Sequence, residues 1–408
     1  MRSDLDRLMQ QRGLAGLVVF AHDRYSPAFY YCTGQKIHHG IFLRSADGRA
    51  HLVVDPMERD QAAAALCEWS TYAQHGFLAM VKSAESQTLA NAKLIAKLLG
   101  DLQLTGRIAF AGETSLGYAH AMLTALTHEA PGVAIDGSQP DVISMARETK
   151  EEWELEHIRQ CSRAAVQAMA NVRAYLASLT RAGSEFRDPH GAVAKLGHLR
   201  STLHRTFAEH RVAEAGGDSI VAQGRDAGVP HNRGNDDEPV REGATIIVDI
   251  FPGEAGGGYH TDMTRTFVLG KASDAVKEIY AHTHEAFAAA MAAAKGGVLC
   301  RSLQDLACDV FEKHGHATLR VNESAQEGYV HSLGHGVGLA VHEGPRLGGN
   351  ELNTSVLTPG HVVSIEPGLY YPSRGMGCRI EDLVAVRTDG SIENLTPAPY
   401  SLEVEPSA

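Results

Sequence analysis

Short apolar runs alternate with stretches of helical periodicity in the first part of this 408-residue chain. Four apolar runs have the length and composition of strands: GLVVF, IFLR, HLVVD and RIAFAGE. Two further segments, TLANAKLIAKLLG and GYAHAMLTALTHE, place apolar residues three or four positions apart, as on one face of a helix. This alternation predicts a small α/β domain over residues 1–145.

A second domain is predicted over residues 146–408, where the same order of elements occurs twice. In each half, two helical patterns are followed by strands, although no residue-level repeat accompanies them. The helical patterns cover residues 150–178 and 184–208 in the first half and 273–295 and 301–314 in the second. We therefore expect an α+β domain with an internal pseudo-twofold repeat.

Composition and charge narrow the classes of function. The formal net charge of −12 and the lack of a Lys/Arg cluster argue against a nucleic-acid partner. The first residues, MRSDLDRLMQ, lack the apolar core of a signal peptide, and the apolar stretch GLAGLVVFA is too short to cross a membrane. The six cysteines form no CxxC pair, which is typical of a reducing compartment. We expect a cytoplasmic protein without nucleic-acid or membrane partners.

Four carboxylates and one imidazole in the C-terminal half lie on or beside predicted strands. They are Asp249 in VDIFP, Asp262 in GYHTDMTRT, His335 in HSLGHGVGL, Glu366 in SIEPGLY and Glu381 in CRIEDLV. Burying an unpaired carboxylate is costly, so buried carboxylates normally lie beside cations. Two divalent metal ions would neutralise the four charges, and oxygen ligands with one imidazole suit Mn, Co, Zn or Fe. The set predicts a dinuclear metallohydrolase.

These motifs, in this order, resemble those of the pita-bread metallopeptidases, a group that contains prolidases, aminopeptidase P, methionine aminopeptidase and creatinase. The resemblance covers residues 145–390, and residues 1–145 more loosely resemble the N-terminal domain of the creatinase and prolidase type. It implies a C-terminal pita-bread fold preceded by a smaller creatinase-type α/β domain. It also implies a homodimer with two divalent metal ions per subunit, Mn first and Co or Zn as alternatives.

The resemblance assigns a role to each of the five ligands. Asp249 would chelate one metal, and Asp262 and Glu381 would bridge the two. His335 and Glu366 would complete the second metal. The two aspartates are separated by more residues than is common in the family, and the surplus falls in PGEAGGG. We expect a longer hairpin loop there.

Further residues match positions around the metals in the family. His231 and His342 are expected to act on the substrate, and Glu366 is expected to pass a proton from the attacking water to the leaving nitrogen. Three more residues are assigned to the substrate pocket: His331, Arg379 and Tyr370. Arg379 and Glu381 are two residues apart, so on a strand both would point to one face. A lone histidine in a chain with 22 of them is more often a solvated or satisfied side chain.

Arg346 in HEGPRL distinguishes between substrates. Prolidases resemble one another in having an arginine here that grips the C-terminal carboxylate of a dipeptide. The alternative is a structural ion pair with Glu343 or Glu351. We expect a Xaa-Pro dipeptidase in which a metal-bridging hydroxide attacks small peptides that end in or contain proline. A Xaa-Pro aminopeptidase (aminopeptidase P) acting on longer peptides and a metal-free binding module of the same fold stay open.

Overall fold

The computed structural model describes residues 3–22, 24–214 and 217–407. The chain folds into two compact units, of which the first comprises Met1–Arg147 with Gly256–Gly258 and the second comprises Glu148–Ala255 with Tyr259–Ala408. The first unit ends two residues beyond the domain boundary that the sequence predicts. Each unit has its own sheets and its own buried apolar clusters.

A six-stranded mixed sheet, in the order β4-β3-β2-β1-β5-β6, forms the centre of the first unit. Its strands are β1 (Gly16–His22), β2 (His39–Ser45), β3 (Ala50–Val54), β4 (Glu68–Thr71), β5 (Gly106–Gly112) and β6 (Val133–Asp136). The strand β2 pairs antiparallel with β1 and β3, whereas β4, β5 and β6 join by parallel pairing. The four strands expected from the sequence are all present.

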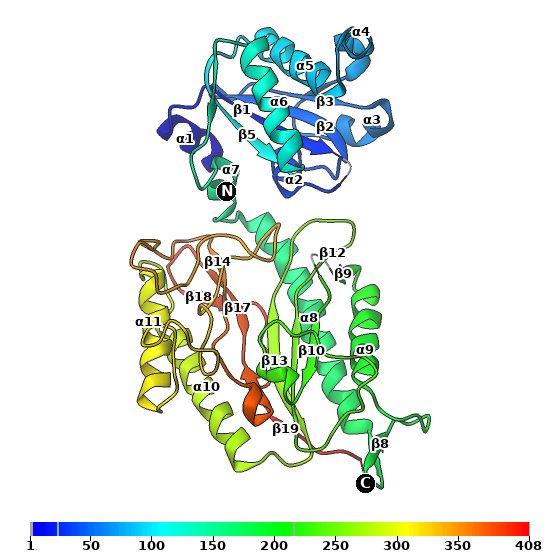
Figure 1. Ribbon diagram of the computed structural model, residues 1–408, viewed down its shortest axis with the longest axis vertical. Helices are drawn as coiled ribbons and strands as arrows, with labels where there is room; N and C mark the ends of the chain where they lie inside the picture. The colour runs from blue at the N-terminus through cyan, green and yellow to red at the C-terminus, as the bar shows by residue number, and fades with distance from the viewer. Residues whose placement is uncertain (1–2, 23, 215–216, 408) are drawn as a thin grey trace. The chain divides into compact units, whose positions relative to one another are not determined.

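Seven helices belong to the described part of the first unit. They are α1 (Asp4–Gln11), α2 (Pro27–Thr33), α3 (Arg59–Ala63), α4 (Phe77–Ser83), α5 (Gln87–Asp101), α6 (Leu116–Glu129) and α7 (Val142–Arg147). The two predicted helices are α5 and α6, which Figure 1 shows against the sheet. Leu94, Ile95 and Leu98 of α5 pack with Val18 and Leu43 of the sheet, which explains their spacing in the sequence.

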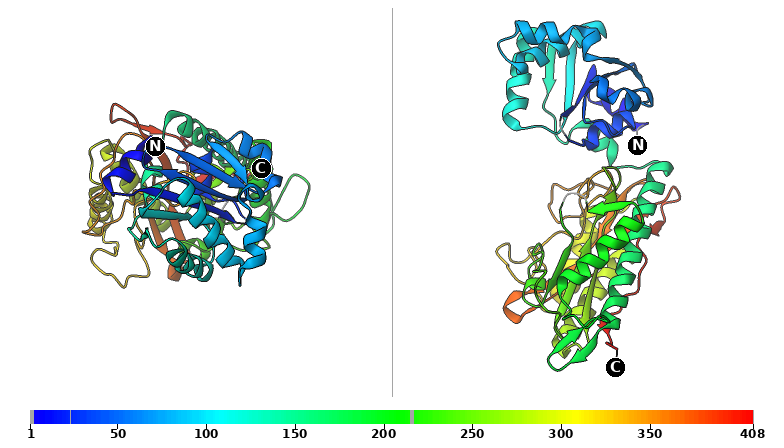
Figure 2. Two further views of the ribbon diagram at one scale, coloured as in Figure 1. Left: turned by 90° about the horizontal axis from the view of Figure 1, so that it is seen from above. Right: turned by 90° about the vertical axis from the view of Figure 1, so that its right-hand side faces the viewer.

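The first half of the second unit places two helices against a four-stranded sheet, in the order β10-β11-β13-β19. The helices are α8 (Glu152–Ser178) and α9 (Leu196–Glu209), which run side by side (Figures 1 and 2). The strands of this sheet are β10 (Ile220–Gln223), β11 (Thr245–Ile250), β13 (Met263–Leu269) and β19 (Glu403–Val404). Two smaller sheets pair β7 (Thr180–Ala182) with β8 (Glu185–Arg187) and β9 (Val212–Glu214) with β12 (Pro252–Glu254).

One predicted helix is shorter than expected. The helical pattern over residues 184–208 is realised only from Leu196, because β7 and β8 pair as an antiparallel hairpin before it. Gly183, with φ of 68°, lies at the turn of this hairpin in the left-handed region that glycine adopts without strain. Along the chain, this hairpin connects α8 to α9.

The second half repeats the order of two helices followed by strands. Its elements are α10 (Asp274–Ala293), α11 (Cys300–Lys313), β14 (Val362–Ile365), β15 (Gly368–Tyr371), β16 (Met376–Arg379), β17 (Asp382–Val386) and β18 (Ile392–Asn394). They form the sheets β14-β17-β18 and β15-β16. The strands of both halves lie between the helix pairs α8/α9 and α10/α11 (Figure 1), so the α+β fold with its internal repeat is confirmed.

The glycine-rich segment between Asp249 and Asp262 is more ordered than a simple loop. Its first part forms β12, which pairs antiparallel with β9. The following turn is closed by a hydrogen bond of 3.0 Å from the Glu254 N–H to the Tyr259 carbonyl oxygen. The segment connects the antiparallel strands β11 and β13, as the predicted longer hairpin loop would, and its surplus residues form an extra strand and a turn.

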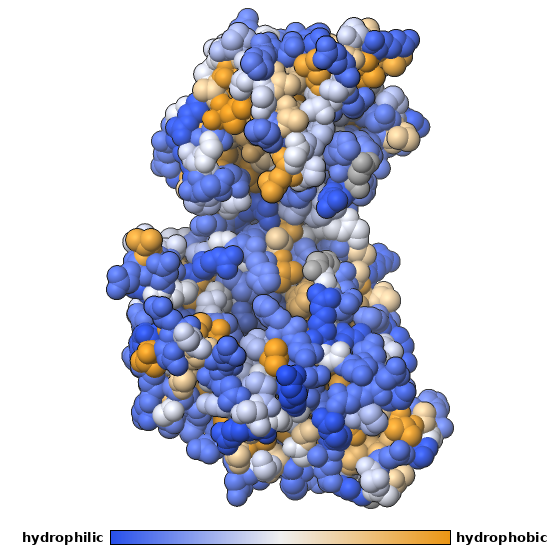
Figure 3. Space-filling view, viewed as in Figure 1, coloured by the Kyte–Doolittle hydropathy of each residue, from blue (hydrophilic) through white to orange (hydrophobic). Residues whose placement is uncertain are grey.

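The surface and the helices give one further finding about membranes. On the face that Figure 3 shows, polar residues predominate and apolar residues are interspersed among them. In the part of the chain that the structure describes, no helix has both the length and the apolar character needed to cross a membrane.

Candidate metal centre

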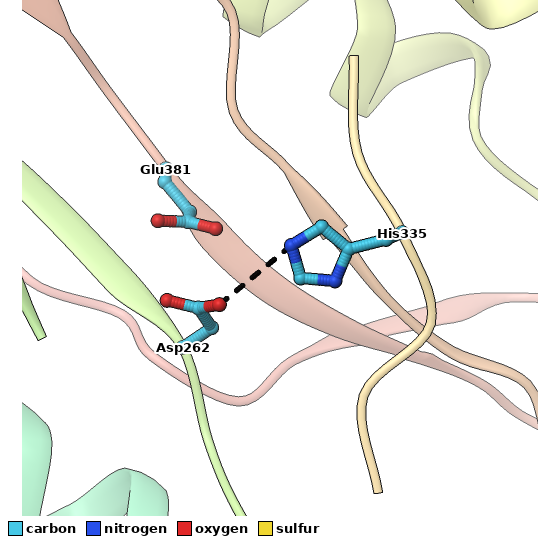
Figure 4. A group of neighbouring side chains, drawn as sticks. All are labelled: Asp262, His335 and Glu381. Carbon is cyan, nitrogen blue, oxygen red and sulfur yellow. Dashed lines mark ion pairs between the residues drawn. The ribbon is translucent and has the colours of Figure 1, made fainter. Parts of the chain in front are cut away.

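Three of the predicted ligands converge in the second unit. Asp262, immediately before β13, and Glu381, between β16 and β17, face His335 (Figure 4). One ligand atom of each lies within 4.8 Å of the other two, and all three residues are buried. Asp262 Oδ2 is 3.8 Å from His335 Nε2. Because the ligands come from segments distant in sequence, only the folded domain assembles this cluster.

The two carboxylates of this cluster are electrostatically strained. Burial, reinforced by the other carboxylates, holds the pKa of Asp262 and of Glu381 well above the usual range. Thr264 Oγ1 donates a hydrogen bond of 2.7 Å to Glu381 Oε2. Within the described residues, Glu381 Oε1 is buried and has no hydrogen-bond partner. A buried oxygen of this kind, beside a second carboxylate and an imidazole, fits a divalent cation.

Glu366 and His335 form a charged pair at the edge of the cluster. Glu366 follows β14, and its Oε1 lies 3.2 Å from His335 Nε2 and accepts a hydrogen bond of 3.2 Å from Ser364 Oγ. Burial alone would raise the pKa of Glu366, but His335 lowers it to about 2. For the imidazole of His335 burial acts in the opposite direction and would lower the pKa, but Glu366 and Asp262 raise it to about 9. The carboxylates of Glu366 and Asp262 thus favour a positive charge on or beside the His335 ring.

Asp249 lies next to the cluster and is not one of the three converging residues. It is on β11, and its Oδ2 accepts a hydrogen bond of 2.5 Å from Arg379 Nη2. Its charge contributes to the raised pKa of Asp262. Arg379 Nη1 in turn donates to the Tyr370 hydroxyl at 2.7 Å, and this hydroxyl lies 2.9 Å from His331 Nε2. The three residues predicted for the substrate pocket therefore form one network with Asp249.

The other predicted site residues lie around the cluster. The rings of His342 and His335 meet edge to face with centroids 4.3 Å apart. Partial desolvation and the charge of His335 lower the pKa of His342, and Arg346 and His231 act in the same direction. His231 also acts on the pKa of His331. His231, His342 and Arg346 are all exposed. The structure therefore places every predicted site residue in or beside one centre.

The guanidinium of Arg346 forms no ion pair or hydrogen bond with residues 3–22, 24–214 or 217–407. Glu343 pairs instead with Lys150, at 3.2 Å. Glu351 accepts a hydrogen bond from Arg301 through its backbone carbonyl oxygen. The alternative of a structural ion pair between Arg346 and Glu343 or Glu351 is therefore wrong.

Comparison with known proteins identifies the family. The sequence profile of Metallopeptidase family M24 matches residues 156–388, more than half of the chain. The chain belongs to metallopeptidase family M24. The match includes all five proposed ligands, so the cluster of Asp262, His335 and Glu381 is part of the family's domain. Use of a divalent metal follows from this membership together with the buried cluster.

Curated relatives of this metallopeptidase include dipeptidases. The "Probable dipeptidase PepE" of Mycobacterium tuberculosis is 36% identical over 270 residues, which are 65% of this chain and 63% of that protein. The "Xaa-Pro dipeptidase" of Pyrococcus furiosus is 35% identical over 174 residues, 43% of this chain and 46% of that protein. The chain therefore matches less than two thirds of the length of either relative.

Solved structures of similar proteins share the fold. The prolidase of Pyrococcus horikoshii OT3 has a TM-score of 0.75 at 22% identity and covers 98% of this chain and 99% of its own. The X-Pro aminopeptidase of Thermotoga maritima MSB8 has a TM-score of 0.75 at 25% identity, with the same coverage. The similarity extends over both units, and the predicted pita-bread architecture with a preceding smaller domain is confirmed.

Several residues of this metallopeptidase site were not found by sequence reasoning. Thr264 and Ser364 hold Glu381 and Glu366, and each lies two residues from a predicted ligand. The period of two in a strand could have indicated them. Arg265, between Thr264 and Thr266, pairs with Asp382 at 2.7 Å and donates to the Glu381 carbonyl oxygen at 2.7 Å. No local signal marks that pair, because its members are 117 residues apart.

Proposed function

We propose that this M24 protein is a dinuclear, metal-dependent Xaa-Pro dipeptidase. The observation that carries the proposal is the buried cluster of Asp262, His335 and Glu381, with a Glu381 oxygen that has no partner among the described residues. Exposed Arg346 beside His342 then selects the substrate. The names of relatives, "Probable dipeptidase PepE" and "Xaa-Pro dipeptidase", support the same reaction.

Five residues would hold two divalent metals: Asp249, Asp262, His335, Glu366 and Glu381. Oxygen-rich ligands with one imidazole suit Mn, which we propose as the metal, with Co or Zn as alternatives. Bound metals of this kind supply Lewis acidity that makes water nucleophilic near neutral pH. The hydrogen bond from Arg379 leaves one oxygen of Asp249 engaged and fixes the direction in which the carboxylate points.

The remaining residues would orient the peptide and move its proton. Glu366 stays ionised at neutral pH, so it can accept a proton from the attacking water and deliver it to the leaving nitrogen. The leaving nitrogen of any peptide bond must gain a proton. In an Xaa-Pro bond that nitrogen also has no N–H with which to bind to the site. His342 and His231 would contact the scissile amide from the exposed side. His331, held by Tyr370, would line the same pocket.

Arg346 would bind the C-terminal carboxylate of the dipeptide. Its guanidinium is exposed and has no partner in the described parts of the chain, so its donors are available to a ligand. A planar guanidinium matches a carboxylate with two parallel hydrogen bonds. Such a contact favours a substrate that ends one residue after the cleaved bond.

The second candidate is a Xaa-Pro aminopeptidase that acts on longer peptides. It is favoured by the similarity of fold to the X-Pro aminopeptidase of Thermotoga maritima, over 98% of this chain. Arg346 favours the dipeptidase, because a longer peptide would not present its carboxylate at the same distance from the cleaved bond.

We also propose a homodimer in the cytoplasm, without nucleic-acid or membrane partners. The net charge of −12 supports the lack of a nucleic-acid partner. None of the six cysteines, all of which the structure describes, forms a disulfide, which supports a reducing compartment. The homodimer rests on family resemblance, and a measurement of mass in solution tests it.

The test is hydrolysis of Leu-Pro and Leu-Pro-Gly by the chelated protein, before and after addition of Mn, Co or Zn. We expect metal-dependent cleavage of Leu-Pro. Arg346→Ala should raise KM for Leu-Pro by about tenfold to a hundredfold, as expected for loss of charged hydrogen bonds. The matched control is Arg387→Ala, because Arg387 is an exposed arginine that pairs with Glu393 away from the cluster.

Two results would contradict the proposal in different ways. A preference for Leu-Pro-Gly, with Arg346→Ala unchanged, would make the protein an aminopeptidase. No hydrolysis of either peptide by protein that binds metal would overturn the substrate class and leave only the metal centre.

A further inference from the structure

A buried ion pair connects the beginning of the second unit with the segment that carries His342. Lys150 Nζ lies 3.2 Å from Glu343 Oε2, and the two side chains are 1% and 5% exposed. Two further hydrogen bonds hold Lys150. Its ammonium donates to the Glu148 carbonyl oxygen at 3.2 Å, and its backbone N–H donates to the Gly360 carbonyl oxygen at 2.8 Å. The ammonium therefore occupies a fixed position in the catalytic domain.

Glu343 closes the loop of residues 336–343. Its backbone exchanges two hydrogen bonds with Gly336, of 2.8 and 3.1 Å. Its side chain accepts a hydrogen bond of 3.0 Å from the Ala340 N–H through Oε1, while Oε2 faces Lys150. The loop contains no helix or strand. These bonds fix its shape together with two others, from the Val337 N–H to the Val362 carbonyl oxygen at 3.0 Å and from the His260 N–H to the Gly338 carbonyl oxygen at 2.8 Å. His335 directly precedes this loop.

Among the described residues, the side chain of His342 takes no part in the hydrogen bonds that hold the loop. Across the parts of the chain that the structure describes, no hydrogen bond to His342 is present, and its ring contacts that of His335. Its place therefore depends on the neighbouring residue Glu343. The packing leaves little freedom, because a Cβ at Gly338 would lie 2.5 Å from Glu343 Oε2 and 2.8 Å from Lys150 Cε.

A buried ion pair is weak evidence of a gain in stability. Removing two charges from water offsets most of their attraction, whereas removing one partner leaves an uncompensated buried charge. A pair whose members are 193 residues apart fixes the geometry between two segments that no sheet or helix connects directly. Here the segments are the start of the second unit and the loop of residues 336–343, which contains His342.

We propose that the Lys150–Glu343 pair positions His342 for the substrate. The inference rests on the proposed function, because it takes His342 to be a residue that contacts the scissile amide. Lys150 and Glu343 are positioning residues and do not touch the substrate. Their effect is on kcat, since a small displacement of a group that acts at the reacting bond slows the chemical step.

The decisive variant is the neutral pair Lys150→Met with Glu343→Gln. It keeps the approximate shape of both side chains and an acceptor for the Ala340 N–H, and it removes both charges of the pair together. We expect a melting temperature near that of the wild type, kcat lower by about tenfold to a hundredfold, and little change in KM. The single variant Lys150→Met should lose both kcat and melting temperature, because it removes the cation that lies 3.2 Å from the buried Glu343 carboxylate.

A double-mutant comparison ties the effect to His342. His342→Ala should lower kcat in the wild type, and the neutral pair should add little to that loss in the His342→Ala background. The matched control is the neutral pair Arg159→Met with Glu393→Gln. This partly buried pair, 22% and 23% exposed, joins α8 to β18, so its replacement should leave kcat unchanged.

A second measurement does not depend on turnover. Hydrogen exchange of the backbone N–H groups in residues 336–343 should be faster in the neutral pair than in the wild type, and unchanged in the Arg159/Glu393 control. If the neutral pair has the kcat of the wild type and unchanged hydrogen exchange, the proposal is overturned and the pair is purely structural. Additive losses with His342→Ala would overturn it too.

Failure of the proposed function would look different. If the wild type cleaves neither Leu-Pro nor Leu-Pro-Gly, the dipeptidase proposal fails, and hydrogen exchange still decides whether the pair holds the loop. If the wild type cleaves Leu-Pro but His342→Ala has full activity, the role of His342 is wrong and the positioning proposal falls with it.

Discussion

Glu381 and Asp382 are adjacent acidic residues, both buried, with opposite electrostatic surroundings. Asp382 Oδ1 pairs with Arg265 at 2.7 Å, and its Oδ2 accepts a hydrogen bond of 2.5 Å from the Tyr400 hydroxyl. The Glu381 carboxylate receives one hydrogen bond, from Thr264, and its other oxygen has no partner within the described chain. Asp382 therefore has a cation built into the protein, and Glu381 has none.

The difference shows where the fold supplies positive charge and where it leaves the charge to a ligand. Both carboxylates are in the same low-dielectric interior, so both need compensation. The protein compensates Asp382 with an arginine of the neighbouring strand. At Glu381 it places a second carboxylate and an imidazole instead. Burial, followed by the charges of Asp262 and Glu366, raises the pKa of Glu381. A buried acid without a cation of its own thus marks the position that we propose for the metal.

The largest expected effect comes from removing the metal. Chelation should lower the rate of Leu-Pro hydrolysis by roughly a thousandfold or more, because the metals supply several kcal/mol of transition-state stabilisation. Addition of Mn should restore the rate, and the melting temperature should rise with metal concentration. Activity that survives exhaustive chelation, with metal content checked by mass spectrometry, would contradict the assignment of this cluster.

The next effect compares the two neighbours directly in metal-free protein. Asp382→Asn should lower the free energy of unfolding by about 3–5 kcal/mol, because it leaves Arg265 buried without a counter-charge. Glu381→Gln should instead raise the melting temperature, because it removes repulsion from Asp262. Denaturant and thermal unfolding measure the two changes. A loss of stability in both variants would show that Glu381 is compensated within the protein, contrary to the comparison.

The smallest effect tests a buried base that carries no charge. His361 is 5% exposed, and burial, assisted by Lys150, lowers its pKa to about 4. Its Nδ1 accepts a hydrogen bond of 3.2 Å from the Thr358 N–H, which requires the neutral ring. Because the folded pKa lies below the unfolded value, this contribution to stability is complete above pH 6.5. It is lost as the pH falls from there towards 4.

The loss at His361 should amount to about 1–3 kcal/mol. Unfolding of the wild type and of His361→Gln, measured between pH 7 and 4, should show it as a difference that changes with pH. Parallel curves for the two proteins would mean that His361 does not titrate in this range.

The local patterns of the chain predicted the elements well. Apolar periodicity indicated the helices α5, α6, α8, α10 and α11 and the strands of the first unit, because their buried faces have a regular spacing. It misjudged residues 184–195, where a short hairpin with Gly183 at its turn replaces the start of the expected helix. Short strands such as β4 and β6 carry too few residues for a pattern to appear.

The sequence names the residues of the candidate site but not their arrangement. The five proposed ligands occur in recognisable strings, but the sequence does not show that Arg379 engages Asp249 or that Lys150 pairs with Glu343. In RIEDLV the two acids look equivalent, and only the fold separates them. Such differences depend on contacts between distant segments, which leave no local pattern.

The separation of the ligands along the chain also affects how the protein comes to its active form. The hydrogen bond between Thr264 and Glu381 closes a loop of 117 residues, so the acidic cluster forms only after non-local pairing, which is slow compared with helix formation. A nascent chain that has not yet reached Glu381 lacks the complete set of ligands. Completion of the acidic cluster is therefore a late event in folding.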